Sequence, residues 1–306
     1  MRIAIFGTGG VGGYFGGLLA HAGHDVTFIA RGAHLQAIRE KGLEVRSVHG
    51  DFTVHPAQAT ARPSEVGLVD YVIVAVKHYH LAEAAPMVRH LVGPNTVVAP
   101  LLNGVDAHEY LIEVLGNEPV IGGLCALVSM IEAPGIIRQT SRLRRVELGE
   151  LDGNQSERVE RLIRAWSEGG VESIHSDSIH IALWNKLLFI ASFGGVTALA
   201  RANAGEILST PQTRTLFIQA MREIEAVARS QGTSLPSDAV ERGLGLAEAV
   251  APEGTSSMQR DVAAGRPFEL EAFSGKIVQL GEASGVETPV HRGIYSLLKP
   301  ALDRAT

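Results

Sequence analysis

The first half of the chain alternates short apolar runs with glycine-rich or amphipathic stretches. Residues 2–6 and 26–30 have the pattern of strands, and the near-continuous apolar runs at 69–76 and 96–100 are typical of strands buried on both faces of a parallel sheet. An amphipathic stretch over 106–115 follows the last of these runs. The alternation predicts an α/β domain built on a parallel sheet.

Three further runs are expected to complete this sheet with antiparallel strands: 120–131, 136–140 and 145–149. Strand patterns then stop, and helical spacing takes over. Thr210-Pro211 and Thr288-Pro289 each place a proline at the first position of an expected helix. We therefore expect an α/β domain over 1–175, followed by a mainly α-helical domain over 176–306.

Composition favours a soluble protein that binds small molecules. Of the 306 residues 45% are hydrophobic and 20% charged, and the net charge of −6 gives no diffuse attraction to nucleic acid or to an anionic membrane. The longest unbroken apolar runs are shorter than a membrane helix, and no signal peptide is evident, so we expect a cytoplasmic protein. The single cysteine, Cys125, is expected in the core.

A glycine-rich turn follows the first strand. Gly7, Gly9 and Gly12 form the pattern G-x-G-x-x-G between a strand and a helix. In such a turn the first glycine permits the tight bend, the second lets backbone amides approach a pyrophosphate, and the third allows close packing of helix on strand. The motif predicts a Rossmann-type dinucleotide-binding domain.

The second strand ends at Arg31, where an NAD site carries an acid that binds the ribose 2′-hydroxyl. The nearest acid, Asp25, precedes that strand and so lies at the opposite end of the sheet. A guanidinium can bind a 2′-phosphate that a carboxylate would repel, so the expected cofactor is NADP(H). The alternative is that Arg31 is a solvated surface residue.

Two more polar residues follow predicted strands. Lys77 comes after the run at 69–76, and Asn103 comes after the run at 96–100. Ligands bind beyond the carboxyl ends of strands in such sheets, so both residues are expected to contact cofactor or substrate. Either could instead be an ordinary exposed loop residue.

Three features of the helical half could carry chemistry. Lys186 lies in the apolar stretch IALWNKLLFIASFGGVTALA, although most lysines in such a setting extend an apolar stem along the core. Ser257 follows Ser256, which together with Gln259 fits a helix capping box, so a purely structural role is an equal alternative. Glu269 and Glu271 are expected at the start of a helix, where acids are also favoured electrostatically.

Taken together, the chain resembles the ketopantoate reductase family. The matching landmarks, in the order of the family and over nearly the whole chain, are GTGGVGGYFGG, IARGAHL, VAVKHYH, LLNGVDAHEYL, WNKLLF, GVTAL and TSSMQRDVAAGRPFELE. The resemblance implies NADPH-dependent reduction of 2-dehydropantoate to pantoate, a step of pantothenate biosynthesis, in a cleft between a Rossmann and a helical domain.

The resemblance also implies residue roles. Gly7, Gly9 and Gly12 would hold the pyrophosphate, with Arg31 and Lys77 at the adenosine-phosphate end and Asn103 beside the nicotinamide ribose. Lys186 would be the catalytic lysine and general acid, Ser257 the substrate-binding serine, and Glu269 the active-site glutamate. The second domain would be the substrate and catalytic domain, and a homodimer through it is a further expectation.

The chain departs from the family pattern after the lysine. Pantoate-forming members carry asparagines four and eight residues after it, where this chain has Ile190 and Gly194. Ile190 would present an apolar wall to the substrate, and Gly194 would leave extra space. The alternative substrate is therefore a bulkier or less polar 2-oxo or 2-hydroxy acid, and a third reading is a regulatory module that senses NADPH without turnover.

Metal and nucleic-acid binding are not expected. The histidines are scattered and form no ligand set, and His78 and His80 are expected on a solvated loop. Arg142, Arg144 and Arg145 form one short basic cluster without an aromatic platform, which is expected to be a solvated hairpin.

Overall fold

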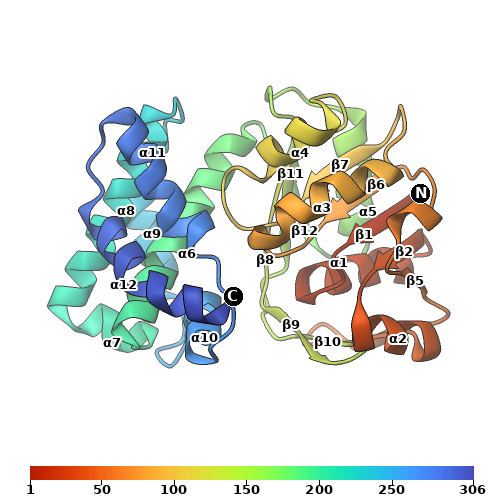
Figure 1. Ribbon diagram of the computed structural model, residues 1–306, viewed down its shortest axis with the longest axis horizontal. Coiled ribbons are helices and arrows are strands. Elements are labelled where there is room, and N and C mark those ends of the chain that lie inside the picture. Colours follow the sequence, from red (N-terminus) through yellow and green to blue (C-terminus); the bar gives the residue numbers. More distant parts are fainter. The chain divides into compact units, whose positions relative to one another are not determined.

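The chain divides into two units in the computed structural model, which describes residues 1–306. The first unit is Met1–Ile179 and the second is His180–Thr306. All strands belong to the first unit, and the second contains only helices (Figure 1). An α/β fold followed by a helical fold is therefore confirmed.

A five-stranded parallel sheet lies at the centre of the first unit. Its order is β5-β2-β1-β6-β7, and every neighbouring pair is parallel. The strands are β1 (Arg2–Phe6), β2 (Asp25–Ile29), β5 (Gln58–Thr60), β6 (Tyr71–Val74) and β7 (Val97–Pro100). The apolar runs predicted all of these except β5, which is short and bears a polar residue at each end.

Helices cover both faces of this sheet. They are α1 (Gly10–His21), α2 (Gly32–Lys41), α3 (Leu81–Val88), α4 (Ala107–Leu115) and α5 (Glu157–Glu168), with short 3-10 turns at Pro63–Glu65, His78–His80 and Arg89–Leu91. Alternate residues of β1 divide between two apolar cores: Ile3 and Ile5 pack with α1 and α5, and Ala4 and Phe6 with α3 and α4. Burial on both faces explains the unbroken apolar runs in the sequence.

The antiparallel extension expected of this sheet is wrong. The expected strands, together with β3, β4 and β12, form two separate sheets, of order β4-β3-β10-β9 and β12-β11-β8. Their strands are β3 (Leu43–Ser47), β4 (Phe52–Val54), β8 (Gly122–Ala126), β9 (Ser129–Ala133), β10 (Ile136–Gln139), β11 (Arg145–Gly149) and β12 (Glu172–His175). The sheet that contains β10 packs on the glycine face of α1. Residue 13 must be glycine for this contact, since a Cβ there would lie 2.7 Å from the Ile137 side chain of β10.

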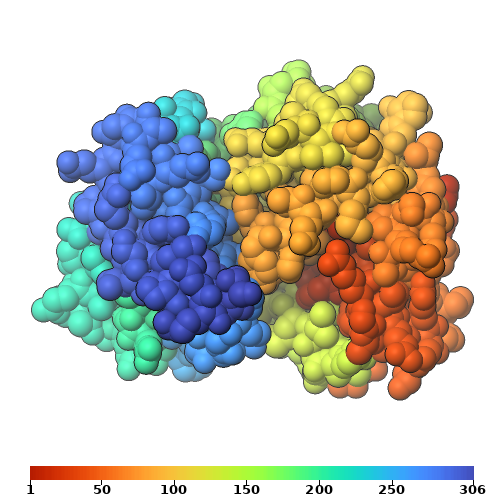
Figure 2. Space-filling model, in the orientation of Figure 1, coloured from red at the N-terminus to blue at the C-terminus, as the bar shows by residue number.

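The second unit packs helices around an apolar core. They are α6 (Ile179–Ala200), α7 (Ala204–Ser209), α8 (Pro211–Ser230), α9 (Ala239–Glu248), α10 (Ser257–Ala263), a π-helix (Glu271–Gly275), α11 (Lys276–Ser284) and α12 (Pro289–Ala305). Helices α8 and α12 begin at their prolines as predicted, although neither preceding threonine caps its helix through the side chain. Phe217, Met221 and Ile224 of α8 are fully buried. Helix α12 (dark blue) buries His291 and Ile294, and its other face lies at the surface (Figure 2).

Helix α6 is long and apolar enough to cross a membrane by length and composition alone. Lys186 and other polar residues interrupt its apolar run in the sequence. Of its most apolar window 61% is buried inside the protein. A mostly buried helix of this length and composition is also found in the cores of soluble proteins.

Candidate functional site

The candidate cofactor residues of the first unit lie along one edge of the parallel sheet. The glycine turn follows β1, Arg31 follows β2, Lys77 follows β6 and Asn103 follows β7. Because the strands are parallel and their order is β5-β2-β1-β6-β7, these residues all lie beyond the carboxyl edge. Along that edge they run from Arg31 through the glycine turn to Lys77 and Asn103.

The three glycines of the turn have different local geometry. Gly7 has a φ of 101°, and the Gly7 and Thr8 amides both donate to the Ile29 carbonyl, at 3.3 and 3.1 Å. A Cβ at Gly12 would collide with the Gly7 carbonyl oxygen, whereas a Cβ at Gly9 would meet no atom within 4 Å. The tight bend and the close helix packing are therefore present, and Gly9 borders open space.

Helix α1 begins at this turn without a side-chain cap. Gly9 is its N-cap, and its first turn contains no acidic residue. Four backbone N–H groups at a helix start lack partners within the helix, and the helix dipole places partial positive charge there. The open space at Gly9 and these uncapped amides fit an anionic group such as a pyrophosphate.

Arg31 supplies the positive charge beside the turn. Its side chain is exposed, and its guanidinium contacts the sulfur of Met87 at 4.0 Å, which is a weak acceptor. Burial lowers the pKa of nearby His34, against a smaller raising effect of the Thr8 backbone. His34 is therefore neutral at pH 7, and Arg31 is the charged group available to a phosphate.

His78 does not lie on a solvated loop, so that expectation is wrong. Its Nε2 lies 2.7 Å from Asp106 Oδ1, and the two side chains are only 10% and 3% exposed. The ring also contacts Tyr110 edge-on, with the centroids 5.7 Å apart. Sequence reasoning missed this pair because its members are 28 residues apart, in two separate landmarks whose pairing no local pattern shows.

In the second unit, α6 carries Lys186, Ile190 and Gly194 at intervals of one helical turn. Lys186 and Ile190 are half-buried, and Gly194 is buried. A Cβ at Gly194 would lie 3.5 Å from Met258 and 3.8 Å from Phe273. Both distances are ordinary van der Waals contacts, so Met258 and Phe273 border the space beside Gly194, and the expectation that this glycine enlarges the substrate site stays a prediction.

Ser257 is the first residue of α10 and is exposed. The preceding Ser256 caps the helix, since its hydroxyl accepts the Gln259 amide at 3.0 Å. The reciprocal half of the expected capping box is absent, because the Gln259 side chain donates to the Ala202 carbonyl at 3.1 Å. The Ser256 hydroxyl also lies 3.0 Å from that of Thr197, which ties α10 to α6.

Glu269 and Glu271 have different surroundings. Glu269 is only 6% exposed, whereas Glu271 binds Lys299 at 2.7 Å and the Tyr295 hydroxyl at 3.1 Å on the surface. The helix expected from Ala272 onward begins as a π-helix at Glu271–Gly275. Single π-turns within helices occur frequently at functional sites. Glu269 lies two residues before this turn and is the more buried of the two acids.

Other features lie outside the candidate residues. The segment with Arg142, Arg144 and Arg145 joins β10 to β11, which lie in different sheets, so the expectation of a hairpin is wrong. Arg145 pairs with Glu172 at 2.7 Å and is 40% exposed, as expected of a solvated residue, whereas Arg144 is half-buried with its Nη1 3.3 Å from the Tyr14 hydroxyl. Cys125 is buried as expected. No group of three or more His, Cys, Asp or Glu residues is arranged to hold a metal ion.

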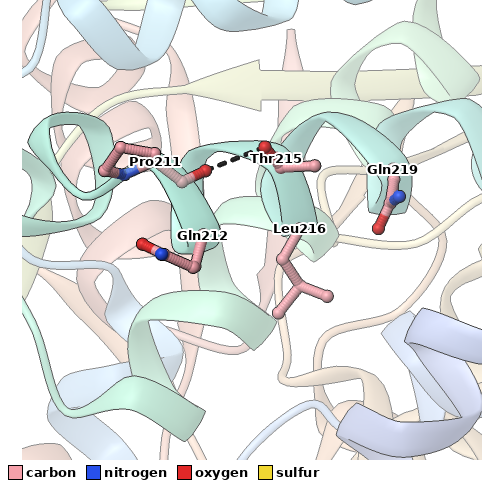
Figure 3. Close-up of a pocket in the computed structure, with 5 residues that line it drawn as sticks. All are labelled: Pro211, Gln212, Thr215, Leu216 and Gln219. Carbon is pink, nitrogen blue, oxygen red and sulfur yellow. Dashed lines mark hydrogen bonds between the residues drawn. The ribbon is translucent and has the colours of Figure 1, made fainter.

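A pocket lies along α8, and Figure 3 shows the side chains that line it. Its volume is about 370 Å³, and it is lined by Pro211, Gln212, Thr215, Leu216 and Gln219. The Thr215 hydroxyl donates to the Pro211 carbonyl at 2.8 Å, so it is already engaged within the helix. None of the candidate residues lines this pocket, and it is not the candidate site.

Comparison with known families agrees with this arrangement. The profile of "Ketopantoate reductase PanE/ApbA" matches residues 3–153, and that of "Ketopantoate reductase PanE/ApbA C terminal" matches residues 178–301. The chain belongs to the ketopantoate reductase family. It is therefore an oxidoreductase of a dinucleotide-dependent family, as the sequence landmarks indicated.

Relatives in the ketopantoate reductase family align end to end with the chain. A 2-dehydropantoate 2-reductase of Mesorhizobium japonicum is 31% identical over 98% of this chain and 97% of its own length. The uncharacterized oxidoreductase YkpB of Bacillus subtilis is 32% identical over 98% of both chains. Full-length alignment shows that both units belong to the family.

Solved structures share this fold. The 2-dehydropantoate 2-reductase of Geobacter metallireducens has a TM-score of 0.92 at 32% identity, covering 98% of this chain and 100% of its own. A D-mandelate dehydrogenase solved with NADH has a TM-score of 0.90 at 24% identity, covering 100% of this chain and 99% of its own. At that identity the second likeness shows the fold alone.

Proposed function

We propose that this protein catalyses the NADPH-dependent reduction of 2-dehydropantoate to pantoate. The observation that carries the proposal is the arrangement of Arg31, the glycine turn, Lys77 and Asn103 along the carboxyl edge of one parallel sheet. Relatives named 2-dehydropantoate 2-reductase that align over the full chain support the substrate.

Charge at the end of β2 supports NADPH over NADH. Arg31 stands where an acid would select a free ribose 2′-hydroxyl. Asp25, at the other end of β2, lies 3.6 Å from Arg2 and accepts from Gln58 at 2.8 Å, so it is engaged at the opposite edge of the sheet. A 2′-phosphate bound at the carboxyl end of β2 would therefore contact the Arg31 guanidinium, and β2 places no carboxylate there to repel it.

Three side chains of the second unit are proposed to act on the substrate. When bound, the reduced nicotinamide supplies a hydride to the ketone carbon, and the developing alkoxide must be stabilised and protonated. The Lys186 ammonium donates a hydrogen bond to the ketone oxygen and then transfers its proton to it, and water returns a proton to the amine. Glu269 orients the lysine or accepts from a substrate hydroxyl, and Ser257 donates to the substrate carboxylate.

The proposal is tested by initial rates of NADPH oxidation with ketopantoate, measured beside the same assay with NADH. We expect saturable turnover with NADPH and a much weaker reaction with NADH. Tight NADPH binding without turnover of any 2-oxo acid would contradict the proposal and favour a sensing role.

A second candidate substrate is a less polar 2-oxo acid. Ile190 is half-buried one turn after Lys186, where pantoate-forming relatives place an asparagine. Loss of one substrate hydrogen bond in a buried site costs about 1–3 kcal/mol. Rates with ketopantoate and with aliphatic 2-oxo acids, for the wild type and for Ile190→Asn, separate the candidates. If ketopantoate is the substrate, the wild type, which has Ile190 in place of the asparagine, reduces ketopantoate faster than the aliphatic 2-oxo acids.

Location and assembly complete the proposal. We place the protein in the cytoplasm as a homodimer associating through the helical unit, as the family resemblance implies. Light scattering of the purified protein measures the mass directly, and a monomer at micromolar concentration would contradict the assembly.

A further inference from the structure

A hydrogen bond joins two loops at the carboxyl edge of the sheet. His78 directly follows Lys77 after β6, and Asp106 lies three residues after Asn103, beyond β7. The His78 Nε2 to Asp106 Oδ1 distance is 2.7 Å. Strands β6 and β7 are neighbours in the sheet, so the pair bridges the two loops that carry Lys77 and Asn103.

Asp106 stands at the start of a helix but does not cap it. It is the N-cap of α4, where an aspartate carboxylate ordinarily accepts a backbone amide of the first turn, yet it makes no side-chain cap hydrogen bond there. Its backbone carbonyl accepts the Glu109 and Tyr110 amides, at 2.9 and 3.4 Å. The carboxylate faces His78 instead.

The surroundings of His78 accommodate its ring closely. Gly104 has a φ of 102°, and a Cβ at that position would lie 3.3 Å from the His78 ring. Tyr110 contacts the ring edge-on. A side chain at residue 104 would therefore both strain the backbone and crowd the imidazole. Glycine at position 104 thus lets the loop after β7 pack closely against the His78 ring.

We propose that His78 and Asp106 form a positioning pair that holds the Lys77 and Asn103 loops at the spacing needed to bind the dinucleotide. This inference rests on the proposed function of Lys77 and Asn103. A charge-assisted hydrogen bond between nearly buried groups is stronger than a neutral or exposed one. Loops ordered before the ligand arrives bind it more tightly, because less conformational freedom is lost on binding.

The test compares two substitutions of His78. His78→Gln keeps an N–H donor near the position of Nε2, and His78→Leu keeps apolar bulk against Tyr110 but cannot donate. We expect His78→Leu to raise the Kd and KM for NADPH about tenfold, with kcat within about twofold of the wild type, and His78→Gln to restore most of the loss. His80→Leu, on an exposed residue of the same 3-10 turn, is the matched control and should bind NADPH as the wild type does.

Asp106 provides the second measurement. If the pair acts as a unit, His78→Leu combined with Asp106→Ala weakens NADPH binding no more than His78→Leu alone. Additive losses, or equal losses for His78→Leu and His78→Gln, would overturn the inference. So would a fall in kcat that parallels a fall in Tm, since that indicates general damage to the fold.

The same assays separate this inference from the proposed function. If the wild type binds NADPH and His78→Leu binds it equally well, the pair has no positioning role while the function stands. If the wild type binds NADPH but reduces no ketopantoate, the substrate assignment fails, and the Kd values still decide the role of the pair. A wild type that binds neither NADPH nor NADH overturns both.

Discussion

At the scale of single residues, glycines of one motif differ in what they permit. A Cβ would find open space at Gly9 but would collide with the Gly7 carbonyl at Gly12. The roles of these glycines could be assigned from their spacing alone, because each position of the motif has its own local requirement for the backbone. It could not foresee that Met258 and Phe273 cover Gly194, because that contact joins segments far apart in the chain.

This contrast predicts two phenotypes from one kind of substitution. Gly9→Ala should change the free energy of unfolding by less than about 1 kcal/mol, because its φ of −82° suits any residue. It should weaken NADPH binding about tenfold or more, because the methyl enters the space proposed for the pyrophosphate. Gly12→Ala should lose about 2 kcal/mol of stability through overpacking. Urea denaturation and NADPH titration of both variants measure the two effects, and unaltered NADPH affinity in Gly9→Ala would argue against the site.

Lys186 carries the chemical step in the proposed mechanism. Lys186→Ala should lower kcat about 10²- to 10⁴-fold, because the general acid is removed, and leave the Kd for NADPH unchanged. Lys41→Ala, at the exposed end of α2, is a matched control for loss of a lysine. Stopped-flow rates and NADPH titration check both, and an alanine variant that keeps most of its activity would show the assignment to be mistaken.

At the scale of elements, a hydrogen bond from His291 of α12 stabilises the π-helix that follows Glu269. His291 is fully buried; its Nδ1 is 3.1 Å from the Ser274 hydroxyl and its Nε2 is 3.1 Å from the Ala220 carbonyl. The carbonyl can only accept, so Nε2 carries the proton and Nδ1 accepts from Ser274. The apolar periodicity of residues 272–280 predicted a helix here but not its π-turn, because that turn depends on these distant partners.

Burial of His291 predicts a stability that depends on pH. Desolvation lowers its pKa from 6.5 to about 4, against a smaller raising effect of the Ala220 carbonyl. The folded state therefore binds fewer protons than the unfolded state, and the stability contribution is complete above pH 6.5 and is lost as pH falls toward 4. The loss amounts to about 3 kcal/mol. Urea midpoints of the wild type and of His291→Gln, measured between pH 7 and 4, check this: the variant should lose less stability over the interval.

At the scale of the whole molecule, the two units were visible in the sequence but the additional sheets were not. Apolar runs indicate which residues form a buried strand, but they do not determine which other strand it pairs with. Strand β10 pairs in parallel with β3, as Ile137 with Val45, across a long sequence separation that no local pattern encodes. Four strands of the main sheet were predictable because they are buried on both faces, whereas β3, β4 and β5 lack an unbroken apolar run because each is partly exposed and carries polar residues.

Ligand binding should stabilise the units unequally. NADPH at 100 times its Kd adds about 2.7 kcal/mol to the structure that binds it. Hydrogen exchange should therefore slow most at the carboxyl edge of the parallel sheet, at Gly7–Gly12 and Ala30–Gly32, and less in the core of α8. Protection confined to the second unit would contradict the proposed cofactor site.

The position of Arg31 bears on how cofactor choice can evolve. Arg31 is the N-cap of α2, with a φ of −133° and no side-chain cap hydrogen bond. An aspartate there would cap the helix and add about 1 kcal/mol of stability, while its carboxylate would favour a free ribose hydroxyl over a phosphate. Arg31→Asp should therefore melt at a higher temperature and prefer NADH, as calorimetry and paired NADH and NADPH rates will show. A lineage could exchange one pyridine nucleotide for the other here in a single substitution, with a gain rather than a loss in folding stability.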